Sequence, residues 1–192
     1  MRITGGQAAR RLLKVPKGLD VRPTPDLVKQ AVFNSLGARV VRTRVLELFA
    51  GTGALSLECL SRGATAVTCI EKSSRHAELL RANAASAGFG GFVQIRAQDV
   101  FTVLPRLHAE GKTYNLIIAD PPYGEKNVAR RSTSFAQKLL DNQTLPLLLE
   151  DNGLFILGHT KRDTLELSPP WQERKLLKHG DTIMRFLARE KK

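Results

Sequence analysis

A chain of 192 residues with 42% hydrophobic and 25% charged residues is long enough to form one domain around its own hydrophobic core. Its two cysteines are too few for a disulfide framework or a four-ligand zinc site, and no run of 18 apolar residues could span a membrane. The 30 lysines and arginines exceed the 18 acidic residues by 12, which favours a polyanionic partner. The first residues lack the apolar core of a signal peptide, so a cytoplasmic protein is expected.

The positive charge is concentrated at the amino-terminal end. Residues 1–44 contain ten of the basic residues and two acids, whereas the remaining 148 residues are nearly balanced. Gly5-Gly6 and the alternating tract at residues 11–15 are typical of an extended, hairpin-like segment. The sequence therefore predicts a basic N-terminal arm, residues 1–24, that binds nucleic acid rather than serving only as a solvated face, followed by one domain over residues 25–192.

Downstream of the arm, the spacing of apolar residues alternates between that of helices and that of strands. A helix is predicted from Pro25 to Leu36, with Thr24 as its N-cap. Strands are predicted at residues 45–49, 66–70, 92–95, 114–119 and 153–157, with a final pair at residues 173–178 and 182–188. Further helices are predicted at residues 54–62, 73–87, 100–109 and 134–150, the last kinked or split by Pro146. This alternation predicts an α/β fold, a single Rossmann-like domain with a mostly parallel, seven-stranded sheet flanked by helices.

Ligands of such sheets bind beyond the carboxyl ends of the strands, so the residues that follow each strand are the candidates. Gly51 and Gly53 follow the first strand and let the backbone approach a ligand closely. Glu71, which follows the second strand, can accept hydrogen bonds from a ribose diol, and Asp99 can meet the amine of an adenine. Ser56 stands where a nicotinamide dinucleotide fingerprint has its third glycine, which counts against a dinucleotide.

The sharper signal is Asp120-Pro121-Pro122-Tyr123, which follows the fourth strand. Two consecutive prolines fix the backbone, so that nearby carbonyl groups point outward in a set direction. A carboxylate, a carbonyl and an aromatic ring together can hold a planar base that carries an amine. A site of this kind polarises the amine and orients it for attack, and the alternative is a rigid turn with an exposed tyrosine.

These motifs resemble those of known methyltransferases. Residues 45–53, Val-Leu-Glu-Leu-Phe-Ala-Gly-Thr-Gly, resemble the first motif of Rossmann-like S-adenosylmethionine-dependent methyltransferases, and Asp-Pro-Pro-Tyr resembles the motif of those that methylate exocyclic amines of bases. Residues 2–6, 22–26 and 33–34 resemble the RsmD-type family, which methylates the N2 of a guanine in 16S ribosomal RNA. The resemblance covers nearly the whole chain and is strongest over residues 1–125.

The resemblance implies a role for each matching position. S-adenosylmethionine is expected to contact Phe49, Ala50, Gly51, Thr52, Gly53, Glu71, Asp99, Val100 and Asp120. The guanine is expected to lie against the catalytic residues Asp120, Pro121 and Tyr123. The 16S rRNA, naked or in an assembling small subunit, is expected to contact Arg10, Arg11, Lys14, Arg22 and Thr24. Gly158-His159 departs from the family pattern, in which many members have an acidic residue after the fifth strand.

The implied reaction is a direct transfer of the methyl group to the amine, which needs neither a metal nor a covalent enzyme intermediate. The two cysteines are accordingly expected to be buried, the four histidines to lie at the surface, and Trp171 to pack beneath the last strands rather than on RNA. A monomer is the simpler expectation. Methylation of adenine N6 in DNA, methylation of a protein glutamine and a non-catalytic RNA-binding module remain alternatives.

Overall fold

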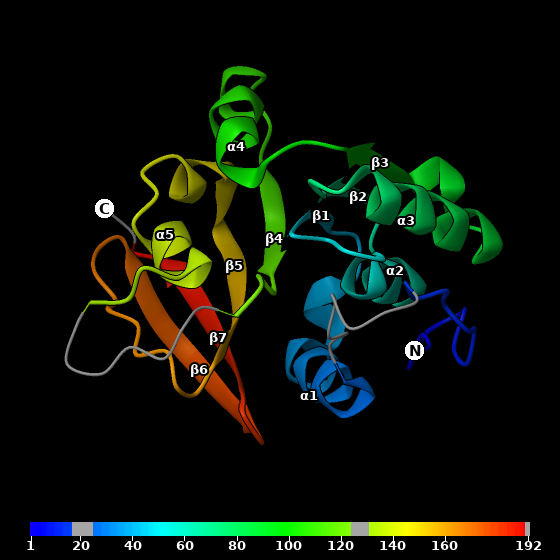
Figure 1. Ribbon diagram of the computed structural model, residues 1–192, viewed down its shortest axis with the longest axis horizontal. Helices are drawn as coiled ribbons and strands as arrows, with labels where there is room; N and C mark the ends of the chain where they lie inside the picture. The colour runs from blue at the N-terminus through cyan, green and yellow to red at the C-terminus, as the bar shows by residue number, and fades with distance from the viewer. Residues whose placement is uncertain (17–24, 124–130, 191–192) are drawn as a thin grey trace.

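The computed structural model describes residues 1–16, 25–123 and 131–190. Its centre is a seven-stranded sheet in the order β3-β2-β1-β4-β5-β7-β6 (Figure 1). The strands are β1 (Arg44–Leu48), β2 (Ala66–Ile70), β3 (Val93–Arg96), β4 (Tyr114–Ala119), β5 (Leu149–Thr160), β6 (Trp171–His179) and β7 (Thr182–Arg189). Strands β1 to β5 run parallel to one another, and β7 is antiparallel to both β5 and β6. The predicted mostly parallel α/β sheet is confirmed.

Successive side chains of the strands alternate between two hydrophobic cores, because neighbouring residues of a strand face opposite sides of the sheet. Val45 of β1 belongs to the core beneath the first three helices, whereas Leu46 and Leu48 belong to the core beneath the last two. Figure 1 shows these two layers. The helices are α1 (Asp26–Leu36), α2 (Ala54–Ser61), α3 (Ser74–Ser86), α4 (Val100–Ala109) and α5 (Phe135–Leu140). Among the described residues, no helix is both long and apolar enough to cross a membrane.

The described part of the N-terminal arm, residues 1–16, is docked on helices α2 and α3. An isolated antiparallel bridge joins Arg2 to Leu12, as expected for a hairpin-like segment. Ile3 and Leu13 are buried in the same core as the first three helices. Lys29 of α1, one of the ten basic residues near the amino terminus, is fully buried, with its ammonium group bonded to the carbonyl of Arg2. This lysine therefore holds the arm and does not contribute to an RNA-binding surface.

Two predicted elements are wrong in their limits. Thr24 lies outside the described residues, and the N-cap of α1 is Pro25. The helix predicted at residues 134–150 ends at Leu140, because Asn142 forms a turn by accepting hydrogen bonds from the next backbone amides and Pro146 cannot supply a helical amide donor. A short 3-10 helix (Leu145–Leu148) follows, so that β5 begins four residues earlier than predicted.

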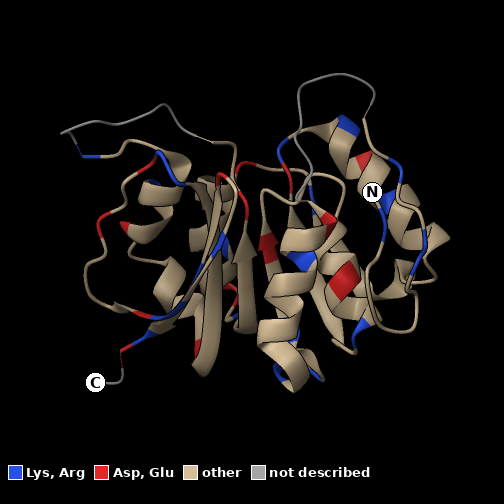
Figure 2. Ribbon diagram, turned by 90° about the horizontal axis from the view of Figure 1, so that it is seen from below, with Lys and Arg blue, Asp and Glu red and all other residues tan. Residues whose placement is uncertain are grey.

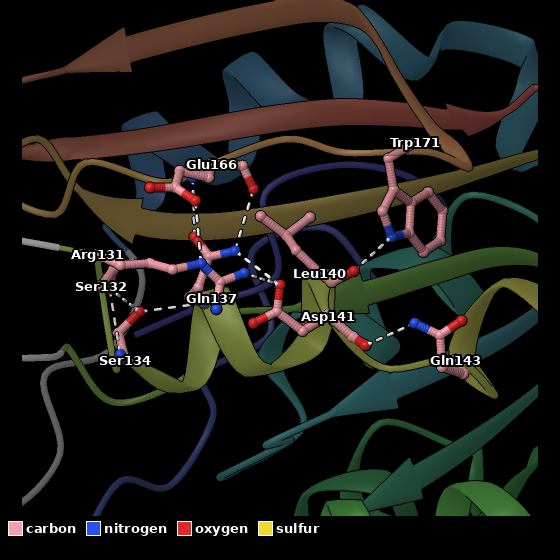
Figure 3. A network of polar contacts seen from close by, with 9 residues as sticks. All are labelled: Arg131, Ser132, Ser134, Gln137, Leu140, Asp141, Gln143, Glu166 and Trp171. Atoms are coloured by element: carbon pink, nitrogen blue, oxygen red, sulfur yellow. Dashed lines mark hydrogen bonds and ion pairs between the residues drawn. The ribbon is translucent and has the colours of Figure 1, made fainter.

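Helix α5 is fixed by polar contacts on both sides (Figure 3). The side chain of Gln137 exchanges hydrogen bonds of 3.0 and 2.8 Å with the backbone of Glu166, and Arg131 pairs with Asp141 and Glu166. Trp171 is buried and donates from its indole to the carbonyl of Leu140 at 3.1 Å. Its predicted packing beneath the last strands is confirmed, and its indole ties the end of α5 to the start of β6.

Candidate active site

A cavity of about 630 Å³ opens beyond the carboxyl ends of β1, β2 and β4. Its position follows from the strand order: the chain leaves β1 for β2 on one side and returns to β4 on the other, which leaves a crevice between the two directions. Residues from four strand ends line this cavity. From the predicted set they are Phe49, Gly51, Glu71, Asp99, Val100, Asp120, Pro121 and Tyr123. The predicted residues Ala50, Thr52 and Gly53 are buried behind the cavity wall.

The glycine loop, residues 49–53, joins β1 to α2 with three residues in the left-handed region. Phe49 has a φ of 57°, Gly51 of 54° and Gly53 of 78°. A Cβ on Gly53 would lie 2.8 Å from Cγ of Leu80, so helix α3 passes too close for any larger residue. Gly51 differs, because a Cβ there would meet nothing within 4 Å. The loop therefore presents bare backbone to the open cavity at Gly51.

Glu71 joins the ends of β1 and β2. Its carboxylate accepts hydrogen bonds from the backbone amide of Gly51 at 2.7 Å and from that of Ser73 at 2.8 Å. The imidazole of His76 lies 3.7 Å from the same carboxylate and also lines the cavity. This carboxylate is therefore held in place by two loops, at the position where a ligand diol can reach it.

Asp99 begins helix α4 and faces the same cavity. One of its oxygens caps the helix by accepting from the amide of Phe101 at 2.9 Å, and the other lies 3.4 Å from the ammonium of Lys72. Apolar walls stand beside this carboxylate: the ring of Phe49 packs against those of Phe101 and Phe135, with centroids 6.2 and 5.4 Å apart. A planar ligand entering the cavity thus meets aromatic edges and an acidic group together.

Asp120 and Tyr123 lie in the segment that follows β4, and both line the cavity. Tyr123 is 41% exposed, and its hydroxyl lies 3.0 Å from that of Thr182 on β7, which fixes the tip of the ring. Gly158 on β5 stands behind Asp120, and a Cβ there would lie 2.5 Å from Oδ1 of the aspartate. Any side chain at Gly158 would therefore displace the Asp120 carboxylate.

Glu47 is a buried acid that the sequence reasoning missed. It lies within β1, 3% exposed, and accepts hydrogen bonds from the backbone amide and hydroxyl of Ser56. Burial raises the pKa of Glu47 to about 7, with a smaller contribution from the charge of Asp120. A lone acid inside an otherwise apolar strand was the signal that could have identified it.

We expect Glu47 to make the free energy of unfolding fall as the pH rises from 5 to 8, because it keeps its proton in the folded chain and loses it in the unfolded chain above about pH 4.5. Glu47→Gln, which resembles the protonated acid, should remove about 2 to 3 kcal/mol of this decline. Denaturant titrations at both pH values measure the difference, with Glu78→Gln on the exposed face of α3 as the control. Parallel pH profiles for the wild type and Glu47→Gln would contradict the assignment.

Histidine and cysteine side chains follow the expectation only in part. Cys59 and Cys69 are buried, as predicted. His159 is buried rather than exposed, and burial together with the neighbouring Arg185 lowers its pKa. Its ring accepts from the guanidinium of Arg185 at 3.0 Å, so it supports the sheet next to Gly158. Within the described ranges, no group of three or more His, Cys, Asp or Glu side chains is placed to hold a metal ion.

The predicted RNA-binding residues of the arm are exposed where the structure describes them. Arg10, Arg11 and Lys14 are at the surface, and Arg11 donates to the carbonyl of Ser86 at the end of α3. Basic residues recur along the amino-terminal part of the chain in Figure 2. Lys14, near the end of the described arm, and Arg75 of α3 line the same shallow groove. Arg75 directly precedes His76, which lines the cavity. Arg22 and Thr24 lie outside the described residues.

Comparison with known proteins is consistent with this site. The family model described as Conserved hypothetical protein 95 matches residues 1–188. "Ribosomal RNA small subunit methyltransferase D" of Escherichia coli (strain K12) is 35% identical over 153 residues, which cover 80% of this chain and 68% of that protein. "Putative rRNA methyltransferase YlbH" of Bacillus subtilis is 29% identical over 161 residues, covering 84% of this chain and 83% of that protein.

A solved structure extends the likeness over the full chain. The structure titled "Putative methyltransferase yhhF from Escherichia coli" superposes with a TM-score of 0.80 at 30% identity, and the match covers 100% of this chain and 99% of that one. The family model and the solved structure both extend over the glycine loop and the strand ends that line the cavity, since they match residues 1–188 and the full chain. The chain belongs to the family described as Conserved hypothetical protein 95, the RsmD-type methyltransferase family that its motifs resemble.

Proposed function

We propose that this protein transfers a methyl group from S-adenosylmethionine to the exocyclic N2 amine of a guanine in 16S ribosomal RNA. The observation that carries the proposal is one cavity in which Gly51, Glu71 and Asp99 stand beside Asp120 and Tyr123. These groups combine the acceptors that a nucleoside cofactor needs with those that hold an amine-bearing base. The relatives named as rRNA methyltransferases support the same substrate class.

The cavity residues fit the proposed cofactor. Open space over the backbone at Gly51 suits the amino-acid part and ribose, with Ala50, Thr52 and Gly53 supporting the loop from behind. Glu71 binds the ribose hydroxyls, and Asp99 accepts from the adenine amine beside Val100 and Phe49. A volume of about 630 Å³ lies within the range of about 300 to 1,000 Å³ that is usual for small-molecule sites. When bound, S-adenosylmethionine supplies an electrophilic methyl group.

The chain's own residues position the guanine. The carboxylate of Asp120 and the carbonyl of Pro121 accept hydrogen bonds from the amine, so that its lone pair faces the methyl group. Tyr123, whose hydroxyl is anchored on Thr182, offers its ring for stacking on the base. Asp120 need not be a strong base, because the amine becomes acidic as it acquires positive charge.

The N-terminal arm, residues 1–24, supplies the phosphate contacts, with Arg10, Arg11, Lys14, Arg22 and Thr24 as the RNA-binding residues. The remaining residues, 25–192, form the catalytic domain. The protein acts as a cytoplasmic monomer on 16S rRNA, free or in an assembling small subunit, and needs no metal. The target guanine leaves its helix to enter the cavity.

Mass spectrometry of 16S rRNA nucleosides from cells with and without the gene tests this proposal. The expected result is the loss of one N2-methylguanosine, restored by the wild-type gene and not by a variant with Asp120 replaced. An unchanged rRNA profile together with a lost N6-methyladenine in DNA would overturn the proposal in favour of DNA methylation. No change in either nucleic acid would favour a non-catalytic RNA-binding protein.

Gly158→Ala is expected to lower the turnover number about 10- to 100-fold, because the new Cβ displaces the Asp120 carboxylate from the position that orients the amine. Affinity for S-adenosylhomocysteine should stay at the wild-type value. The matched control is Gly91→Ala, where a Cβ meets nothing within 4 Å. Single-turnover transfer of a tritiated methyl group measures the effect, and a wild-type rate for Gly158→Ala would show that Asp120 tolerates displacement.

A further inference from the structure

Asn83 of helix α3 lies where the N-terminal arm and the glycine loop meet. Its side chain is 1% exposed. Its carbonyl oxygen accepts from the backbone amide of Lys14 at 2.8 Å, and its amide nitrogen donates to the carbonyls of Lys14 at 3.0 Å and Thr52 at 3.1 Å. Both donor hydrogens of this amide are therefore used, one on each of two segments that are far apart in the sequence.

On one side, Asn83 fixes the backbone of the arm at Lys14, whose side chain is an exposed cation. The side chain of Asn83 bonds to both the amide and the carbonyl of Lys14, as the backbone of a neighbouring strand would. The preceding residue, Leu13, is buried and donates to the carbonyl of Met1 at 3.0 Å, so the contact holds both halves of the hairpin-like segment. RNA that binds the arm in this docked position would therefore favour these two bonds.

On the other side, helix α3 holds the glycine loop at two consecutive residues. Leu80 packs against Gly53, where no Cβ fits, and Asn83, one turn further along the helix, donates to Thr52. The amide of the same peptide, at Gly53, donates to the carbonyl of Ala50 at 2.8 Å, so Asn83 and Ala50 together fix its orientation. The orientation of this peptide affects the backbone at Gly51, which faces the cavity.

The contacts of Asn83 with the arm and with the glycine loop depend on each other. If the arm leaves α3, Asn83 loses two of its three hydrogen bonds, and only the bond to Thr52 still orients its side chain. A side chain that then turns toward water releases Thr52 as well. Docking of the arm and ordering of the glycine loop therefore stabilise each other.

We propose that Asn83 is a positioning residue that couples RNA binding at the arm to cofactor binding at the glycine loop. The proposal rests on the proposed function, since it assigns RNA to the arm and S-adenosylmethionine to the loop. Each ligand binds more tightly when the other is present, and by thermodynamic linkage the factor is the same for both. The coupling favours a complex that holds the methyl donor and the RNA together.

Calorimetry with S-adenosylhomocysteine, in the absence and presence of a 16S rRNA transcript, measures this factor. For the wild-type protein we expect about fivefold tighter binding of S-adenosylhomocysteine with RNA, at the lower end of the usual range for coupled sites. In Asn83→Ala the ratio should fall to one. The matched control is Ser61→Ala, which removes two contacts of α2 with the arm, to Gly5 and Ala8, and touches no residue of the glycine loop. It should keep the wild-type ratio.

A second measurement needs no variant. Hydrogen exchange at the amide of Lys14, which donates to Asn83, should slow when S-adenosylhomocysteine binds to the wild-type protein. A wild-type ratio of one, or unchanged exchange at Lys14, would overturn the coupling while leaving the proposed function intact. A protein that binds neither the transcript nor S-adenosylhomocysteine would instead overturn the proposed function.

Discussion

Replacing Asp120 with alanine is expected to lower the rate of methyl transfer by about 100- to 1,000-fold, while S-adenosylhomocysteine still binds. The size of the loss is that seen when one well-placed polar group is removed from the reacting atoms. In the proposed complex, loss of the carboxylate leaves the guanine amine only one fixed acceptor, and its lone pair is no longer held in line with the methyl group. Because the proposed complex has the main cofactor contacts at the glycine loop, Glu71 and Asp99, the affinity for S-adenosylhomocysteine should change little.

Two assays on the same preparation separate these effects. Transfer of a tritiated methyl group to a 16S rRNA transcript reports the rate, and calorimetry reports the affinity for S-adenosylhomocysteine. Asp151→Ala is the matched control, since this aspartate is 82% exposed and lies at the other end of β5 from Gly158. Transfer by Asp120→Ala at the wild-type rate would remove Asp120 from the reaction, and equal losses in both assays would reassign it to the cofactor.

The parts of the fold that the sequence predicts well are those set by local patterns. Strands β2 and β4 have the predicted limits, because short runs of apolar residues with turn residues at both ends allow little choice. The candidate cavity residues were predictable for a different reason. In a parallel sheet the carboxyl ends of the strands meet at one edge, so the positions after each strand converge whatever the loops do.

What the sequence could not predict depends on contacts between distant segments. The segment after Leu140 has helical spacing, yet the turn at Asn142 and the pairing of β5 with β4 take precedence. Lys29 reads as one more surface cation, and only the docking of the arm makes it a buried tie to Arg2. Glu47 and Asn83 also carry no local signal of their partners, because Ser56, Lys14 and Thr52 reach them through the tertiary fold.

Replacing Glu71 with alanine is expected to weaken the binding of S-adenosylhomocysteine about 100-fold or more. The carboxylate accepts from the amides of Gly51 and Ser73, and in the proposed complex it also binds the ribose hydroxyls. Each hydrogen bond to a charged group contributes about 1.5 to 3 kcal/mol, and 1.4 kcal/mol corresponds to a tenfold change in affinity. The substitution thus removes the proposed contacts with the ribose. It also releases the glycine loop, which is proposed to contact the rest of the ligand.

A split between affinity and rate distinguishes this role from that of Asp120. At saturating S-adenosylmethionine, Glu71→Ala should recover most of the wild-type turnover number, because the groups proposed to hold the guanine follow β4 and are unchanged. The matched control is Glu78→Ala, which removes an exposed carboxylate from α3, the helix that follows Glu71 in the chain. Wild-type affinity in Glu71→Ala would place the ribose elsewhere, whereas a turnover number that stays low at saturation would mean that the glycine loop also positions the methyl group against the amine.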